Sequence, residues 1–114
     1  MSYSSMTEVE EKAVKELFIQ IKDKLDISKI LLFGSKARHE ANEYSDVDLL
    51  VLTRRERTTK DRGLLSDIAA DINIDYGVSL ACLYYNERDW QEGDSINPVL
   101  RDNIVREGIP LVLQ

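Results

Sequence analysis

Two aspartates one residue apart are the residues of this sequence best suited to chemistry. Asp46 and Asp48 lead into the apolar run 49–52. Successive side chains of a strand point to opposite faces, so both carboxylates should project from one face. Two ionised carboxylates at the entrance of a buried strand repel each other and are costly to desolvate. Mg²⁺ would relieve both costs, because it binds one or two protein carboxylates and completes its shell with water and phosphate.

A glycine and a serine upstream of the acids form a candidate phosphate site. Gly34 and Ser35 follow the apolar run 30–33. Glycine permits a tight turn and close approach to the backbone, and serine is a favoured N-cap, so we expect a short helix from Ser35. Free N–H groups at a helix N-terminus suit phosphate, and Arg38 is placed to reach a phosphate oxygen. We expect Lys36 to be solvated.

Each half of this pattern is unspecific alone. An isolated Asp-x-Asp is usually a turn with a solvated edge residue, and Gly-Ser is an ordinary strand-to-helix turn. Together they read Gly-Ser-x10-Asp-x-Asp, with Ala37 and Arg38 inside and apolar runs on both sides. This pattern resembles the signature of the DNA polymerase β-like nucleotidyltransferase superfamily, and most closely its small minimal nucleotidyltransferase group. The resemblance covers most of the chain, including the closing Arg-Glu-Gly-Ile-Pro-Leu.

The resemblance implies a fold, a reaction and a partner. The fold would be α/β (α+β), with helices packed against a small mixed sheet. Gly34, Ser35 and Arg38 would bind a nucleoside triphosphate, with ATP expected, and Asp46 and Asp48 would bind Mg²⁺ and carry the catalysis. The reaction would move a nucleoside monophosphate onto a hydroxyl and release pyrophosphate. Members of this group often pair, as antitoxins, with a small helical HEPN-type toxin, and modify a hydroxyl on it.

One position departs from the family pattern. Family members usually carry a third acid on the next strand, and here Ser79 stands there, in Tyr-Gly-Val-Ser-Leu. The third acid mainly holds the ion that activates the attacking hydroxyl. A neutral serine would bind that ion more weakly. A second hypothesis is therefore a nucleotide-binding module with weak or no transfer, which acts by contact with its partner.

Composition sets the remaining bounds. The 114 residues predict a single domain over 1–114, and no apolar run approaches the roughly 20 residues of a membrane helix. The start of the sequence lacks the features of a signal peptide, so cytoplasmic residence is the default expectation. A net charge of −6 argues against direct nucleic-acid binding. The number of chains in the assembly stays open, a homo-oligomer included.

Local patterns predict the order of helices and strands. The first half should contain a helix that begins at a Thr7–Glu10 capping box and carries an apolar stripe to Leu25, then strand 30–33, the short helix from Ser35 and strand 47–53. Next we expect a helix, marked by apolar residues 64–72, that stops at Gly77, and then strand 78–85. The last part should contain a helical turn capped by Asn86, a helix from Asn97-Pro98 to Gly108 and a short strand within 109–113.

Three further features have modest interpretations. Arginines 54, 55 and 57 indicate a solvated loop, with the rim of the nucleotide site as the alternative. The only histidine, His39, supports neither a zinc site nor a catalytic triad and should be solvated. Cys82 is alone, which excludes an internal disulfide, and should be a small buried apolar residue.

Overall fold

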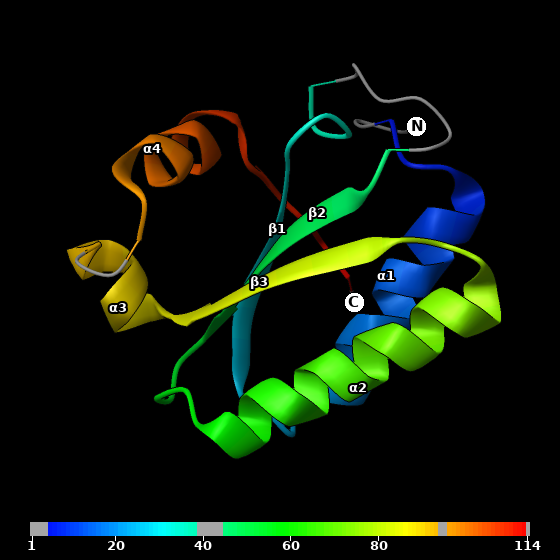
Figure 1. Ribbon diagram of the computed structural model, residues 1–114, viewed down its shortest axis with the longest axis horizontal. Helices are drawn as coiled ribbons and strands as arrows, with labels where there is room; N and C mark the ends of the chain where they lie inside the picture. Colours follow the sequence, from blue (N-terminus) through cyan, green and yellow to red (C-terminus); the bar gives the residue numbers. More distant parts are fainter. Residues whose placement is uncertain (1–4, 39–44, 94–95, 114) are drawn as a thin grey trace.

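The computed structural model describes residues 5–38, 45–93 and 96–113. They form one four-stranded mixed sheet with helices on both faces (Figure 1). The elements are α1 (Glu8–Ile21), β1 (Ile27–Phe33), β2 (Val47–Thr53), α2 (Thr59–Tyr76), β3 (Leu80–Asn86), α3 (Glu87–Glu92), α4 (Pro98–Glu107) and β4 (Ile109–Pro110). The strand order is β3-β2-β1-β4. The neighbours β2 and β3 run parallel, and β1 is antiparallel to both β2 and β4. The predicted α/β fold with a mixed sheet is confirmed.

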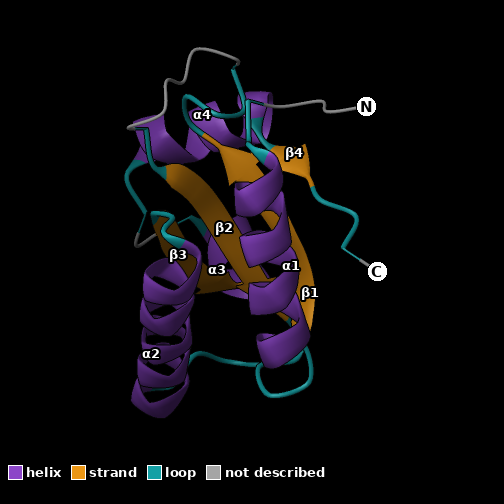
Figure 2. Cartoon of the chain, turned by 90° about the vertical axis from the view of Figure 1, so that its right-hand side faces the viewer, coloured by secondary structure: helices purple, strands orange, loops and turns teal. Residues whose placement is uncertain are grey.

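Strand β2 is the centre of the core because both of its faces are covered. Val47, Leu49 and Val51 belong to the apolar cluster between the sheet and the helices α1 and α2. Leu50 and Leu52 belong to the cluster that includes Trp90 of α3 and Ile104 of α4. Figure 2 shows α1 and α2 side by side on one face of the sheet. The prediction that residues 49–52 form a strand buried on both sides is confirmed.

Helix boundaries follow the predicted caps. The capping box at α1 is present: Thr7 accepts from the Glu10 N–H, and the Glu10 carboxylate accepts from the Thr7 N–H. Gly77 ends α2 in the left-handed conformation, with φ of 65°. Asn86 caps α3 and Asn97 caps α4. These short-range signals succeed because a cap depends on only a few neighbouring residues.

Other boundaries differ from the predicted ones. Strand β1 begins three residues before Ile30, and β3 begins two residues after position 78. Helix α2 begins at Thr59, after the cap residue Thr58, because its first turn is polar and carries no apolar marker. The last strand is only two residues long. Among the described residues, no helix is both long and apolar enough to cross a membrane.

Candidate active site

The two aspartates stand at the start of β2. Asp46 immediately precedes the strand and is exposed, and Asp48 is its second residue and is half-buried. Between and after them, Val47 and Leu49 are fully buried in the cluster under α1 and α2. Because strand side chains alternate, both acids project to the opposite face, as predicted.

The pKa of Asp48 reflects its burial and its charged neighbours. Burial raises the pKa of the Asp48 carboxyl above its usual range, and the negative charge of Asp46 raises that pKa further. The nearby guanidinium of Arg38 acts in the opposite direction and lowers it. Keeping both carboxylates ionised thus costs free energy, through the burial of Asp48 and its repulsion by Asp46. A cation beside the pair would reduce both terms.

Gly34 brings the turn after β1 against this pair. In the antiparallel register Phe33 lies opposite Asp48, so the next residue meets the acid. Gly34 has φ of 75°, and a Cβ atom added to it would overlap the Asp48 carboxylate. A side chain is therefore excluded here by conformation and by space.

The segment after Gly34 is a single turn instead of the predicted helix. The N–H groups of Ala37 and Arg38 both donate to the Gly34 carbonyl, at 3.1 and 3.2 Å. Residues 35–38 are turn, so the expectation that Ser35 caps a helix is wrong for the described residues. Within the part of the chain that is described, the N–H groups of Ser35 and Lys36 donate to no backbone carbonyl. Two adjacent free N–H groups in a tight turn form a concave site suited to an anion.

Lys36 was expected to be solvated, and that expectation is wrong. Its side chain is 2% exposed, and its ammonium lies 2.9 Å from the Glu10 carboxylate. The Lys36 carbonyl also accepts from the N–H of Ser5. Sequence reasoning missed this pairing because Glu10 already had an explanation as a helix cap. The pair anchors the turn to the start of α1.

Arg38 reaches α4. Its Nη1 lies 3.1 Å from a carboxylate oxygen of Glu107, and both side chains are partly exposed. Arg38 also lies close enough to Asp48 to lower that residue's pKa. A guanidinium has five N–H donors and can bind more than one acceptor oxygen. His39 lies outside the described residues.

Ser79 completes the cluster of polar residues. Its hydroxyl donates to Asp46 at 2.6 Å, and its carbonyl accepts from the Val47 N–H at 2.8 Å. The position where the family carries a third acid therefore does lie beside the acid pair. Among the described residues no three acidic, histidine or cysteine side chains come together as a metal-binding group. The arrangement offers two carboxylates and one neutral hydroxyl.

The donor set fits one hard divalent cation. Two mutually repelling carboxylates with oxygen-only donors are what Mg²⁺ prefers, with the remaining positions open to water and phosphate. Asp46 and Asp48 would hold the ion, and the turn at Gly34 would hold the phosphates that accompany it.

The arginine loop lies away from this cluster. It follows the C-terminal end of β2, whereas the acids stand at the start of that seven-residue strand. Arg54 pairs with Asp26, and Arg55 pairs with Asp61 and also donates to the carbonyl of Lys24. This position and these pairings favour the interpretation as a surface loop over the alternative that the arginines form the rim of the nucleotide site.

Comparison with known families agrees with this geometry. A family model described as polymerase beta, nucleotidyltransferase matches residues 14–114. The matched segment contains the glycine turn, both aspartates and Ser79. This chain belongs to the polymerase β nucleotidyltransferase family.

Individual relatives define the similarity further. A provisionally named protein adenylyltransferase of Methanocaldococcus jannaschii, MJ0604, is 33% identical over 101 residues, which cover 87% of this chain and 94% of the relative. A solved structure with the provisional name minimal nucleotidyltransferase is 30% identical, with a TM-score of 0.60, and the match covers 94% of this chain and 99% of that one. The tri-AMPylated HEPN toxin of Shewanella oneidensis in complex with an MNT antitoxin gives 21% identity, a TM-score of 0.52, and coverage of 91% and 73%. At that identity the similarity shows the fold alone.

Replacing Gly34 by alanine tests the contact with Asp48. Gly34 and Gly77 both have positive φ, but a Cβ at Gly77 meets nothing within 4 Å. The positive φ alone should cost each of Gly34→Ala and Gly77→Ala about 1 to 2 kcal/mol of unfolding free energy in urea titrations. Gly34→Ala should lose more than Gly77→Ala, because its Cβ would also overlap the Asp48 carboxylate. Only Gly34→Ala should also lose magnesium-dependent uptake of a triphosphate in calorimetry. Equal uptake by the two variants would contradict the assignment.

Replacing Asp48 by asparagine should stabilise the protein without metal at neutral pH. The pKa of Asp48 is higher in the folded state than in the unfolded state. The folded protein is therefore most stable with respect to this group below the unfolded-state pKa, where the carboxyl is protonated in both states, and it loses that stability as the pH rises through the folded-state pKa. The gain in melting temperature of Asp48→Asn over the native chain should therefore be present at pH 7 and vanish below about pH 4. A gain that is independent of pH would show that charge is not its cause.

Proposed function

We propose that this family member is a magnesium-dependent enzyme that transfers AMP from ATP to a hydroxyl group on a partner protein of the small helical HEPN type. The observation that carries the proposal is the contact of the Gly34 turn with Asp48. This contact supports the proposal, because the turn that would hold phosphate lies directly beside a carboxylate that would hold the cation. Neither half would indicate this chemistry alone.

The turn supplies the groups that would hold the triphosphate. The N–H groups of Ser35 and Lys36 would donate to phosphate oxygens, and Arg38 would add a charge-assisted hydrogen bond. Lys36 itself is occupied by Glu10, so its ammonium is assigned a structural role. The Lys36–Glu10 pair would keep the turn in place before the nucleotide arrives.

The acids supply the groups that would organise the transfer. Mg²⁺, when bound, neutralises phosphate charge and lowers the cost of deprotonating the attacking hydroxyl. In the reaction, the acceptor oxygen forms a bond to the α-phosphorus of ATP. The bond between the α-phosphorus and the oxygen that bridges it to the β-phosphorus breaks, which releases pyrophosphate. The proton of the acceptor hydroxyl would pass to solvent water, which reaches the exposed Asp46. Asp46 is exposed and would face the acceptor, whereas Asp48 is half-buried against the turn.

The nature of the acceptor is supported by the relatives. MJ0604 is provisionally named a protein adenylyltransferase, and the Shewanella antitoxin is bound to a tri-AMPylated HEPN toxin. A hydroxyl on a protein surface suits the site of this chain, because Asp46 and Ser79 are both exposed.

Ser79 favours a second candidate function. If one ion is held too weakly, the protein would bind nucleotide and partner yet transfer slowly, and would act by contact. The hydrogen bond from Ser79 to Asp46 orients that carboxylate but adds no negative charge.

Intact mass of the co-purified partner separates the two functions. The native chain with ATP and Mg²⁺ should add the mass of one or more AMP groups to the partner. Asp46→Ala and Asp48→Ala should each reduce the rate of addition by at least about a hundredfold, because each removes a metal ligand. An unmodified partner that stays bound and inhibited would favour the binding module and reject transfer.

Counting bound ions tests the role of Ser79. With a non-hydrolysable ATP analogue, the native chain should bind about one Mn²⁺ in titrations followed by electron paramagnetic resonance, and Ser79→Asp should bind about two. Ser79→Ala is the matched control and should stay near one. Tight binding of two ions by the native chain would show that the serine does not weaken the site.

A further inference from the structure

Strand β3 leaves one edge of the sheet open. It pairs with β2 on one side only, and in a parallel ladder alternate residues direct their backbone groups to the partner strand. Ser79 directs its carbonyl to β2, so the even-numbered residues of β3 direct theirs outward. In agreement with this alternation, the backbone groups of Leu80 and Tyr84 form hydrogen bonds with side chains outside the sheet.

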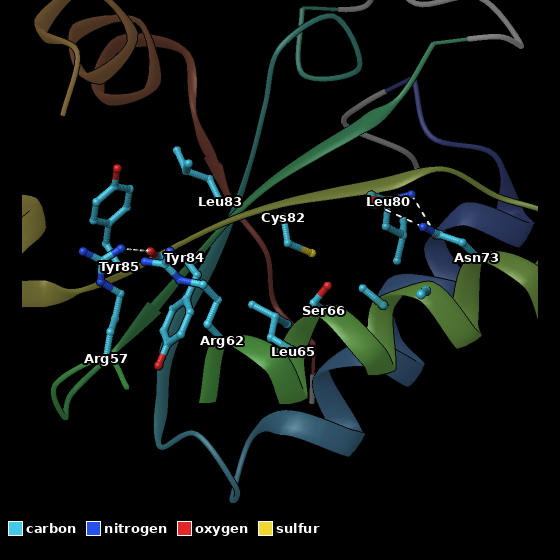
Figure 3. A pocket seen from close by; sticks show the side chains of 12 residues that line it. Arg57, Arg62, Leu65, Ser66, Asn73, Leu80, Cys82, Leu83, Tyr84 and Tyr85 are labelled. Atoms are coloured by element: carbon cyan, nitrogen blue, oxygen red, sulfur yellow. Dashed lines mark hydrogen bonds between the residues drawn. The ribbon is translucent and has the colours of Figure 1, made fainter. Parts of the chain in front are cut away.

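Two side chains cover the ends of this edge. The Asn73 amide accepts from the Leu80 N–H at 2.8 Å and donates to the Leu80 carbonyl at 3.3 Å, as a neighbouring strand would do. Arg57 donates to the Tyr84 carbonyl at 2.9 Å. Figure 3 shows both contacts, with Cys82 between them. Within the described residues, the backbone groups of Cys82 have no such side-chain cover.

A groove runs along the open part of the edge. It lies between β3 and α2 and encloses about 570 Å³. Its α2 wall includes the small residues Ser66, Ala69 and Ala70, which leave room for another chain. Burial raises the pKa of the Cys82 thiol to about 11, so Cys82 contributes a neutral surface at physiological pH. The middle of the groove is therefore lined by small and mostly apolar side chains.

One end of the groove carries two arginines, of which Arg57 is paired with Asp89 at 3.9 Å. Arg57 and Arg62 both line it. Arg57 is engaged with Tyr84, and its guanidinium stacks 4.4 Å from the centre of the Tyr85 ring. Arg62 is exposed, and among the described residues its side chain has no hydrogen bond or ion pair. An unpaired cation at the end of a strand-lined groove complements a carboxylate.

We propose that this groove binds a short extended segment of a partner protein, which adds to the edge of β3 and places an acidic side chain against Arg62. Main-chain hydrogen bonds to Cys82 would give affinity, and the apolar wall with Arg62 would give specificity, as in other cases of strand addition. The covered residues Leu80 and Tyr84 leave three residues, 81–83, between them, over a strand length of roughly 13 Å from Leu80 to Tyr84. A full β3 strand of a second copy would have to displace both Asn73 and Arg57.

The position of the groove gives the docked segment a direction. Leu80, at the Asn73 end, directly follows Ser79 of the candidate active site. The partner chain that leaves this end would pass toward Asp46. Binding in the groove does not itself require nucleotide transfer, so it can be measured without ATP or Mg²⁺.

Selection from a phage-displayed library of linear heptapeptides on the purified chain tests the groove. Enriched peptides should share an Asp or Glu, and their synthetic versions should bind in fluorescence anisotropy. Ser66→Trp fills the groove and should abolish binding. Asp67→Trp introduces tryptophan at the next position of α2, which is not part of the groove lining, and should leave binding intact. No enrichment, or equal binding by both variants, would overturn the proposal.

A charge exchange identifies the contact with Arg62. Arg62→Glu should weaken an enriched peptide about tenfold, and replacing the peptide's acid by lysine should restore binding to that variant. On binding, the amides of Cys82 and Tyr84 should gain protection from hydrogen exchange. Loss of affinity without recovery on charge exchange would place the peptide elsewhere. A dimer of the chain that Ser66→Trp dissociates would show that the occupant is a second copy, which contradicts the proposal.

Discussion

The antiparallel register of β1 and β2 is the constraint on which the site depends. It sets Phe33 opposite Asp48, so the turn that follows one strand meets the acids that begin the other. A shift of one residue would turn Asp48 into the core under α1 and α2 and would move Leu49 to the other face. The burial of β2 on both sides makes such a shift costly. The same apolar residues that stabilise the fold therefore also hold the two halves of the site together.

The buried pair of Lys36 and Glu10 adds a second restraint to the turn. One carboxylate closes the capping box of α1 and also binds the ammonium of Lys36. Burying an ion pair contributes little net stability, but removing one partner leaves an uncompensated charge inside the protein. The turn is thus tied to a helix terminus. A phosphate site that is already ordered loses less entropy when its ligand binds.

Local signals in the sequence were sufficient for the N-caps of α1, α3 and α4, for the end of α2 at Gly77, for the span of β2 and for the shared direction of the two aspartates. They failed at Ser35, where a single turn forms instead of a helix. Ser79 could also be placed beside the acids, because the family pattern specifies where the next strand returns. The burial of Lys36 could not be predicted, since it depends on Glu10, which is 26 positions away. The groove was equally hidden, because its width is set by the packing of α2 against β3. The position of the arginines at the far end of β2 could be read from the sequence, because they follow the strand that the two aspartates begin.

The two edges of the sheet differ in how they resist association. Strand β4 has only two residues, and its second, Pro110, has no N–H with which to extend the ladder. That edge is a poor template for another strand, and the opposite one is shielded at both ends by side chains. Copies of this chain therefore cannot readily stack into a continuous sheet, so an acidic protein with a largely apolar centre avoids one common route to aggregation.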